Sequence, residues 1–257
     1  TVHASDTDGS VAISISATDV AGNVTSGHTS ISGGSVTVDQ TAPASQQVGS
    51  VVTTGGTVVA NYWNSTNTGL QMQVSIANDS SLSSGSIQPL VSTNGGGSFV
   101  NLGSAVNIDD IDATQTVSIT AAVLEAVAGF EESDVLQFKA TLTVNAGNST
   151  TGTVSGTTIT VDQTGPTIST SSIASDNATN TLAKSGDVVT LTIATNENVT
   201  SPTVSFTSGG DAATNNDTVS GDSPGNSFTA AYTVHASDTD GSVAISISAT
   251  DVAGNVT

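Results

Sequence analysis

The sequence predicts an all-β protein made of tandem antiparallel β-sandwiches. Two observations lead to this class: apolar and polar residues alternate along many short segments, and turn-forming Gly, Asn, Asp and Ser separate those segments. The alternation is clearest in 70–76 and 243–250, where apolar residues occupy every second position. The same pattern predicts strands at 117–119, 135–144, 188–193 and 228–234. One helix-like stretch, 121–129, is too short to change the class.

The chain also repeats itself, which sets its domain organisation. Residues 1–25 recur without change as 233–257, an offset of 232 residues (233 − 1). Within that period, Val-Asp-Gln-Thr-x-Pro at 38–43 returns at 161–166, 123 residues later (161 − 38). Each copy forms a short acidic linker with a proline, and proline suits a boundary because it cannot continue a strand ladder.

From these linkers we expect three parts of immunoglobulin-like sandwich. Residues 1–41 are the C-terminal part of one domain (its strands F and G), 42–164 are a complete domain, and 165–257 are a domain without its last strand. The parent protein is then an array of such repeats. An unpaired strand edge invites pairing between chains, so copies of the chain are expected to be able to join head to tail.

The charge of the chain is one-sided. It has 22 acidic residues against two lysines and no arginine, a formal net charge of −20. So few cations exclude nucleic-acid binding and disfavour an anionic membrane surface. Most carboxylates lack an ion-pair partner in the chain, so they repel one another or bind cations from solution. Cysteine is absent, and no apolar run is long enough for a membrane helix. This composition favours an exported, extracellular protein.

Strand parity places the acidic loops at the linkers. In a seven-stranded sandwich, the B–C and F–G loops lie at the end where the chain enters, and the E–F loop lies at the end where it leaves. Linker residue Asp162 should therefore meet a B–C loop at 196–198 and an F–G loop at 251–255 of the following domain. The E–F connection at 130–134 of the preceding domain also points at it. The candidate ligands at this junction are Asp162, Glu197, Asp251, Asn255, Glu131 and Asp134, with Glu132 as an alternative to the last two.

Several carboxylates converging from distant loops predict Ca²⁺, which takes six to eight oxygen ligands in flexible geometry. A second site is expected at the other linker, from Asp39 with Asp6 and Asp8, and with Asn78 and Asp79 from the B–C loop of the next domain. The acids of the repeated loops, Asp19, Asp238 and Asp240, are further candidates. The alternative is that all of these are ordinary turn residues, because Asp and Asn favour turns through side-chain hydrogen bonds to the backbone.

Several motifs resemble one known family. They are Asn-Thr-Leu-Ala-Lys-Ser-Gly-Asp-Val-Val-Thr-Leu-Thr-Ile at 180–193, Ala-Ala-Tyr-Thr-Val at 230–234, Ser-Asp-Thr-Asp-Gly at 237–241 and Ala-Thr-Asp-Val-Ala-Gly-Asn at 249–255. Together they resemble the bacterial Ig-like extender repeats of giant, type I-secreted biofilm adhesins. Residues 56–69 look like a second repeat type of such proteins. The resemblance implies extender domains on the bacterial cell surface that hold an adhesive tip away from the cell and are made rigid by calcium between neighbouring repeats.

One motif departs from the family pattern. The segment 144–148 reads Val-Asn-Ala-Gly-Asn where the usual Asp-x-Ala-Gly-Asn supplies a carboxylate. With Asn145 taken to stand in that place, calcium at the entry end of the middle domain is in doubt.

The sequence does not predict an enzyme. Its histidines, His3, His28 and His235, form no nucleophile–base pattern, and none of the common catalytic motifs occurs. Two other functions stay open. Tyr62 and Trp63 beside Asn64 and Asn67 are compatible with a carbohydrate-binding module, although the small number of aromatic residues favours Trp63 as a core residue. The exposed strand edges are compatible with a subunit of an extracellular filament or surface layer.

Overall fold

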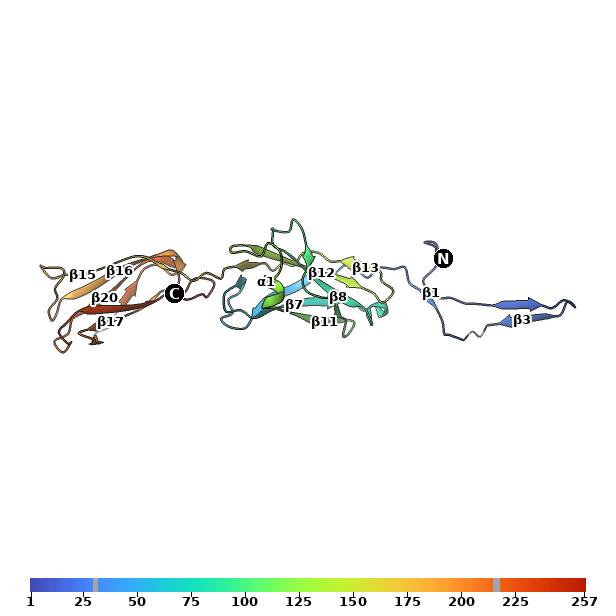
Figure 1. Ribbon diagram of the computed structural model, residues 1–257, viewed down its shortest axis with the longest axis horizontal. Coiled ribbons are helices and arrows are strands. Elements are labelled where there is room, and N and C mark those ends of the chain that lie inside the picture. The colour runs from blue at the N-terminus through green and yellow to red at the C-terminus, as the bar shows by residue number, and fades with distance from the viewer. Residues whose placement is uncertain (30–31, 215–217) are drawn as a thin grey trace.

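The computed structural model describes residues 1–29, 32–214 and 218–257. They form three parts that follow one another along the long axis of the molecule (Figure 1). The predicted all-β class is confirmed, because every part is made of short, mostly antiparallel strands in several sheets. The C-terminal end of the chain lies between the second and third parts, not at the tip of the molecule (Figure 1).

The first part is a pair of small two-stranded sheets. Strand β1 (Gly9–Ser10) pairs with β4 (Thr37–Val38), and β2 (Ile15–Thr18) pairs with β3 (Val24–His28). Residues 1–29 are exposed along their whole length, including the apolar ones. Nothing in the described residues packs against these strands to form a core of the kind seen in the other two parts.

The second part is a sandwich with one continuous core. One sheet has the order β11-β7-β5 and the other β10-β8-β12-β14-β6, with β9 and β13 paired to β8 and β12. The strands are β5 (Val48–Thr54), β6 (Tyr62–Trp63), β7 (Gly69–Ile76), β8 (Ser86–Ser92), β9 (Val100–Asn101), β10 (Val106–Asn107), β11 (Ala113–Thr120), β12 (Val135–Thr143), β13 (Ser149–Thr151) and β14 (Ile159–Val161). Trp63, Phe138 and Met72 are fully buried between the sheets.

Burial alternates along these strands as the sequence predicts. In β12, every second residue from Leu136 to Leu142 is buried, and its neighbours are half-buried. A 3₁₀ turn, η1 (Ser80–Leu82), follows β7 closely. The helix α1 begins at Ala121 as predicted but ends at Glu125, short of the predicted 129, and Leu124 is its only fully buried side chain. In the described parts of the chain, the helical segments fall short of the length and apolarity that a membrane span requires.

The third part is a smaller sandwich of a four-stranded and a three-stranded sheet. The orders are β15-β16-β20-β19 and β18-β17-β21. The strands are β15 (Ile168–Ser175), β16 (Val188–Val199), β17 (Thr203–Ser208), β18 (Asp211–Ala212), β19 (Thr218–Ser220), β20 (Gly225–Thr233) and β21 (Val243–Ser248). Leu191, Phe206 and Tyr232 form the centre of its core, with the Phe206 and Tyr232 rings 4.9 Å apart.

One predicted loop lies inside a strand. Residues 196–198, expected as the B–C loop, belong to β16, which runs on to Val199. The pairing of β16 with β20 shifts between Ala194 and Val199, so these residues form an irregular, bulged section. A bulge re-aims side chains at the end of a strand, and here it occurs at Glu197, beside the Asp162 linker.

Candidate functional site

Asp162 occupies a fixed position at the end of the second part. It follows β14 directly, and its backbone N–H donates to the carbonyl of Trp63 at 2.9 Å. The next N–H, that of Gln163, donates to Oε2 of Glu132 at 2.9 Å. The linker therefore leaves the second sandwich in a defined direction, with the Asp162 carboxylate at the boundary between the two parts.

Asp251 is held by its own loop in the third part. Its Oδ1 accepts hydrogen bonds from the N–H groups of Ala253 and Asn255, both at 2.9 Å. Gly254 has φ of +96°, a conformation that suits glycine and lets the loop turn back. Asp251 is only 2% exposed and forms a β-bridge with Val199, which ends β16. The loop thus places a buried carboxylate next to the bulge that carries Glu197.

The three carboxylates meet at the junction. Asp162, Glu197 and Asp251 each offer an oxygen within 4.8 Å of the others. They come from the linker, a strand and a loop that are far apart in the sequence. The parity of a seven-stranded sandwich predicts this convergence. A cavity of about 310 Å³, lined partly by Glu132, Asp162 and Glu197, adjoins the group.

The charges of these groups oppose one another. Burial raises the pKa of Asp162 to about 6, and the neighbouring carboxylates of Asp251, Glu132 and Glu197 contribute to the increase. Burial, followed by the charge of Asp251, also raises the pKa of Glu197. Neither lysine relieves this repulsion: Lys139 lies over the ring of Phe99, and Lys184 neighbours Asp187. A group of acids in this state gains from a bound cation.

Glu132 is the acid of the preceding domain that reaches the site. The sequence offers Glu131 and Asp134 as candidate ligands, with Glu132 as an alternative to both. In the structure, Asp134 accepts from the N–H of Glu131 at 2.9 Å and so closes a turn. Glu132 instead binds the linker and acts on the pKa of Asp162. The turn made by Asp134 is local and explains why its carboxylate is engaged elsewhere.

Asn255 positions the carboxylates. Its Nδ2 donates to the carbonyl of Asp162 at 2.9 Å, to Asp162 Oδ1 at 3.3 Å and to Asp251 Oδ2 at 2.9 Å. Its Oδ1 accepts from the N–H and Oγ of Ser65, at 2.9 and 2.7 Å. Because the amide oxygen is already used by Ser65, we assign Asn255 to positioning Asp162 and Asp251 and not to cation binding.

A packed, uncharged contact accompanies the acidic group. Asn64, which is 0% exposed, donates through Nδ2 to the carbonyls of Thr57 and Ala253, both at 2.7 Å. A Cβ on Gly254 would lie 3.0 Å from side-chain carbons of Thr57 and Val59. The hydrogen bond from Asn64 to Ala253 joins the second and third parts across 189 positions of sequence, and no local sequence pattern predicts it.

The fully buried Trp63 is a core residue. Its side chain is 0% exposed, and its Nε1 donates to Glu125 Oε1 at 3.2 Å. Its ring packs edge-on against Phe130, with centroids 6.5 Å apart. The ring offers no open face for stacking on a sugar, which removes the main support for a carbohydrate-binding module. Asn64 and Asn67 serve the junction and its loop instead.

The Asp39 linker repeats part of this arrangement. Asn148 Nδ2 donates to the carbonyl of Asp39 at 2.9 Å and to its Oδ1 at 3.4 Å, as Asn255 does to Asp162. Asp8 accepts from the N–H of Gln40 at 2.8 Å, as Glu132 does from Gln163, and also from Thr41 Oγ1. These bonds hold the pKa of Asp8 below its usual value. Each linker is therefore hydrogen-bonded to an acid of the preceding part and to an asparagine of the following part.

The second junction differs in its carboxylates. Within the described residues, the acids around Asp39 do not form a group of three with oxygens as close as those at Asp162. Asp8, Asp39 and Asp79 line one cavity of about 680 Å³, but Asp79 is used to cap η1 through Ser81. The backbone N–H of Gly147 donates to the backbone carbonyl of Val144, and the N–H of Gly254 donates in the same way to the backbone carbonyl of Asp251. Val144, and not Asn145, therefore stands in the place of Asp251, which corrects the sequence interpretation.

The remaining predicted acids lie in turns. Asp6 accepts from the N–H of His3 at 2.7 Å, and its copy Asp238 accepts from that of His235 at 2.8 Å. Asp19 bonds to Ala21 and Asn23 within its own exposed loop, and Asn23 lowers its pKa. Asp240 lines a separate cavity in the third part. These four acids stand apart from the Asp162 group.

Comparisons with known proteins identify no family for this chain. No protein-family model matches the chain, and no curated protein matches it. Among solved structures, the crystal structure of the FN1–FN3 domains of chicken CNTN1 is similar to this chain. The match covers 94% of this chain and 70% of the CNTN1 chain. The two share 13% sequence identity, with a TM-score of 0.36.

Proposed function

We propose that this chain is a structural extender segment of a repetitive bacterial cell-surface adhesin, made rigid by Ca²⁺ at the junctions between its domains. The observation that carries the proposal is the convergence of Asp162, Glu197 and Asp251 on one junction, with Glu132 beside them. These residues belong to the second part, the linker and the third part. A cation bound among them would therefore connect three pieces of chain that otherwise repel.

The donor set fits calcium by its chemistry. Ca²⁺ prefers carboxylate and carbonyl oxygens and tolerates irregular geometry, and all four side chains here are carboxylates. The residues that would hold the ion are Asp162, Glu197, Asp251 and Glu132, and waters would complete its coordination. When bound, the ion supplies positive charge that offsets the mutual repulsion of the acids, whose effect is visible in the raised pKa of Asp162.

The direct test is calcium titration of the full chain by calorimetry. We expect saturable binding that Glu197→Gln weakens by at least about tenfold, because the substitution removes one carboxylate ligand and leaves the side chain the same size. Asp110→Asn is the matched control, since Asp110 is an exposed acid in the loop between β10 and β11. Equal affinity in wild type and Glu197→Gln would show that the cluster is not the site.

A further inference from the structure

The loop 251–255 of the third part is held in shape by hydrogen bonds of its own. Asp251 Oδ1 accepts from the N–H groups of Ala253 and Asn255, and Asn255 Nδ2 donates to Asp251 Oδ2, all at 2.9 Å. The N–H of Asp251 donates to the carbonyl of Asn255 at 3.0 Å and closes the loop at its base. All of these bonds lie within the loop, so its shape does not depend on the second part.

The first copy of the repeat shows the same loop in other surroundings. Residues 19–23 have the same sequence as 251–255, and Asp19 makes the same three side-chain bonds to Ala21 and Asn23, at 2.8–2.9 Å. Residues 19–23 are exposed, whereas the acid, the alanine, the glycine and the asparagine of the second loop are buried. The loop therefore has its conformation before it packs against another surface.

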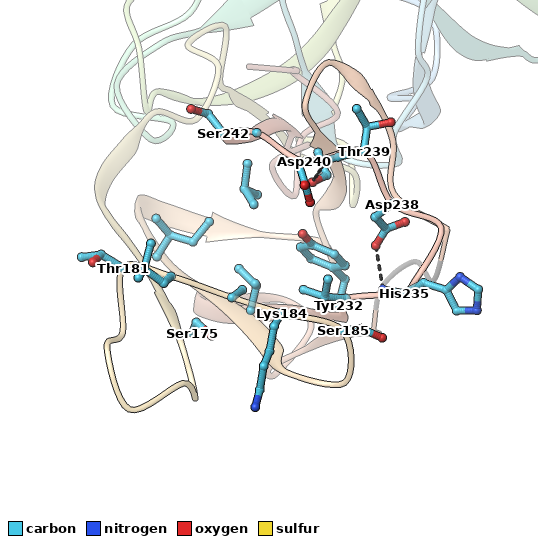
Figure 2. A pocket seen from close by; sticks show the side chains of 18 of the residues that line it. Ser175, Thr181, Lys184, Ser185, Tyr232, His235, Asp238, Thr239, Asp240 and Ser242 are labelled. Carbon is cyan, nitrogen blue, oxygen red and sulfur yellow. Dashed lines mark hydrogen bonds between the residues drawn. The ribbon is translucent and has the colours of Figure 1, made fainter.

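The other loop of the repeat behaves in the same way. Asp238 accepts from the backbone N–H of His235 at 2.8 Å (Figure 2), and Asp6 accepts from that of His3 at 2.7 Å. Thr214 Oγ1 also donates to Asp238, at 2.7 Å. Both repeated loops thus take their shape from their own sequence.

The surface that receives the loop belongs to residues 55–67 of the second part. Asn64 is fully buried, and its Nδ2 donates to the carbonyl of Ala253 at 2.7 Å. The N–H and the hydroxyl of Ser65 donate to Asn255 Oδ1, at 2.9 and 2.7 Å. The acceptors are a main-chain carbonyl and an amide oxygen, both uncharged, so these bonds do not depend on a cation.

The receiving segment, 55–67, is fixed as well. The N–H and hydroxyl of Thr66 donate to Asn64 Oδ1 at 3.0 and 2.7 Å, and the N–H of Asn64 donates to Asn67 Oδ1 at 2.9 Å. Asn64 Nδ2 has two hydrogens, of which one goes to the carbonyl of Thr57 and the other to the third part. Two surfaces that are fixed in advance lose little conformational freedom when they meet.

A close approach at Gly254 completes the contact. A Cβ at this position would lie 3.0 Å from Cγ2 of Thr57 and of Val59, and 3.2 Å from Nδ2 of Asn64. A Cβ at the equivalent Gly22 would have nothing within 4 Å, although φ is nearly the same, +93° against +96°. The three atoms nearest to Gly254 all belong to the second part, so this surface fits a glycine and excludes a larger residue.

We propose that residues 55–67 form a latch that holds the loop 251–255, and with it the third part, without calcium. The proposal rests on the extender function proposed above and adds a second, metal-independent connection to the same junction. The latch keeps Asp162, Glu197 and Asp251 close together although their charges repel. Calcium then binds to two parts that are already in contact, and it removes the repulsion that still allows them to move.

The test is hydrogen exchange of single backbone amides in the full chain, followed by NMR in chelator. The N–H of Ser65 reports on the latch, because its acceptor, Asn255 Oδ1, belongs to the third part. The N–H of Thr66 is the internal reference, because its acceptor lies within the receiving segment. In chelator we expect the Ser65 amide to exchange at least about 100-fold more slowly than an amide of an unfolded chain.

Gly254→Ala should open the latch, and Gly22→Ala is its matched control. Both substitutions place alanine at a positive φ in the same sequence, so they share the backbone strain, but only the new Cβ at 254 meets the second part. We expect exchange at Ser65 to accelerate at least about tenfold in Gly254→Ala and to stay unchanged in Gly22→Ala. Thr66 should stay protected in both.

A second pair of variants changes the receiving side and leaves the loop 251–255 intact. Val59 is half-buried against Gly254, whereas Val58 beside it is 55% exposed. Val59→Glu should therefore accelerate exchange at Ser65, and Val58→Glu should not.

Three results would overturn the proposal. The first is a wild-type Ser65 amide that exchanges in chelator as fast as an unfolded one. The second is loss of protection at Thr66 in wild type, since the receiving segment would then not be fixed in advance. The third is an equal effect of the two substitutions within either pair. Because calcium is absent throughout, these results are independent of the calcium titration proposed above, and either proposal can fail alone.

Discussion

At the scale of single residues, the junctions depend on asparagine amides as much as on carboxylates. Asn255 and Asn148 each donate from Nδ2 to the backbone and side chain of a linker aspartate. An amide of this kind binds the carboxylate without adding charge, and it orients the acid toward the boundary. Asn255 also accepts from Ser65, so one side chain connects the linker, the third part and the second part.

Asn255→Ala should destabilise the junction by about 1–3 kcal/mol, because it leaves the partners of a buried amide unsatisfied. The chain contains its own control. Asn23 occupies the same place in the identical first copy, but it is exposed and bonds only within its own loop. Asn23→Ala should therefore leave the melting temperature unchanged. Chemical denaturation of both variants in chelator measures the difference, and equal losses would show that the Asn255 contacts contribute nothing.

The pKa of Asp162 predicts how pH acts on the metal-free junction. When the two parts separate, the pKa of this carboxyl returns from about 6 toward its ordinary value of 3.8. The state in which the second and third parts are in contact therefore binds the Asp162 proton more tightly than the separated state does. The contribution of Asp162 to this contact is most favourable below pH 3.8. This contribution is lost as pH rises from about 3.8 to about 6.

The measurement is thermal melting in chelator between these pH values, compared with Asp162→Asn. The wild-type junction should become less stable relative to the variant as pH rises, because the amide does not ionise. A constant difference between the two proteins across the range would contradict the raised pKa.

At the scale of elements, alternation along the strands is the part of the fold that the sequence predicts well. The buried positions of β7 and β12 follow the period-two pattern closely. Strand parity correctly brought Asp162, Glu197 and Asp251 together. The contacts of Asn64 and Ser65 with residues 253–255 were not predictable, because they depend on how two folded surfaces fit and leave no local pattern. The placement of Glu197 in a bulge, and not a loop, was missed for the same reason.

Residues 1–25 and 233–257 have the same sequence but different surroundings, which gives a prediction for Ala249, between β21 and Asp251. Ala249 is buried against Val199 and Phe228, whereas its copy Ala17 is exposed in β2. Ala249→Asp should destabilise the third part by about 3–5 kcal/mol, since it places an unpaired charge in a core. Ala17→Asp should have almost no effect. Denaturation of the two variants provides the comparison, and similar effects would mean that the two copies share one environment.

At the scale of the whole molecule, the two junctions are built on one plan but differ in their carboxylates. Both linkers are clasped by an acid on one side and an asparagine on the other. At the Asp162 junction, the loop 251–255 of the third part provides a buried acid, Asp251. At the Asp39 junction, the corresponding loop of the second part has Val144 at that position. Calcium is therefore expected to act more strongly at Asp162, and the rod should be stiffer there.

Val144→Asp tests this difference by giving the Asp39 junction the missing carboxylate. In chelator the variant should melt at a lower temperature than wild type, because Val144 is buried in the core of the second part. Added calcium should recover most of the loss and produce an additional binding event in calorimetry. Destabilisation that calcium does not relieve would show that the Asp39 junction cannot bind the ion even with the acid present.

The central claim is that calcium at the Asp162 junction fixes the second and third parts relative to each other. Small-angle X-ray scattering of the full chain tests it most directly, with calcium and then with chelator, under conditions where sedimentation shows single chains. We predict that calcium narrows the distance distribution to that of an extended rod, and that Glu197→Gln removes the effect while Asp110→Asn keeps it. Scattering curves that are the same with calcium and with chelator would contradict the claim and leave the junction acids as solvated turn and linker residues.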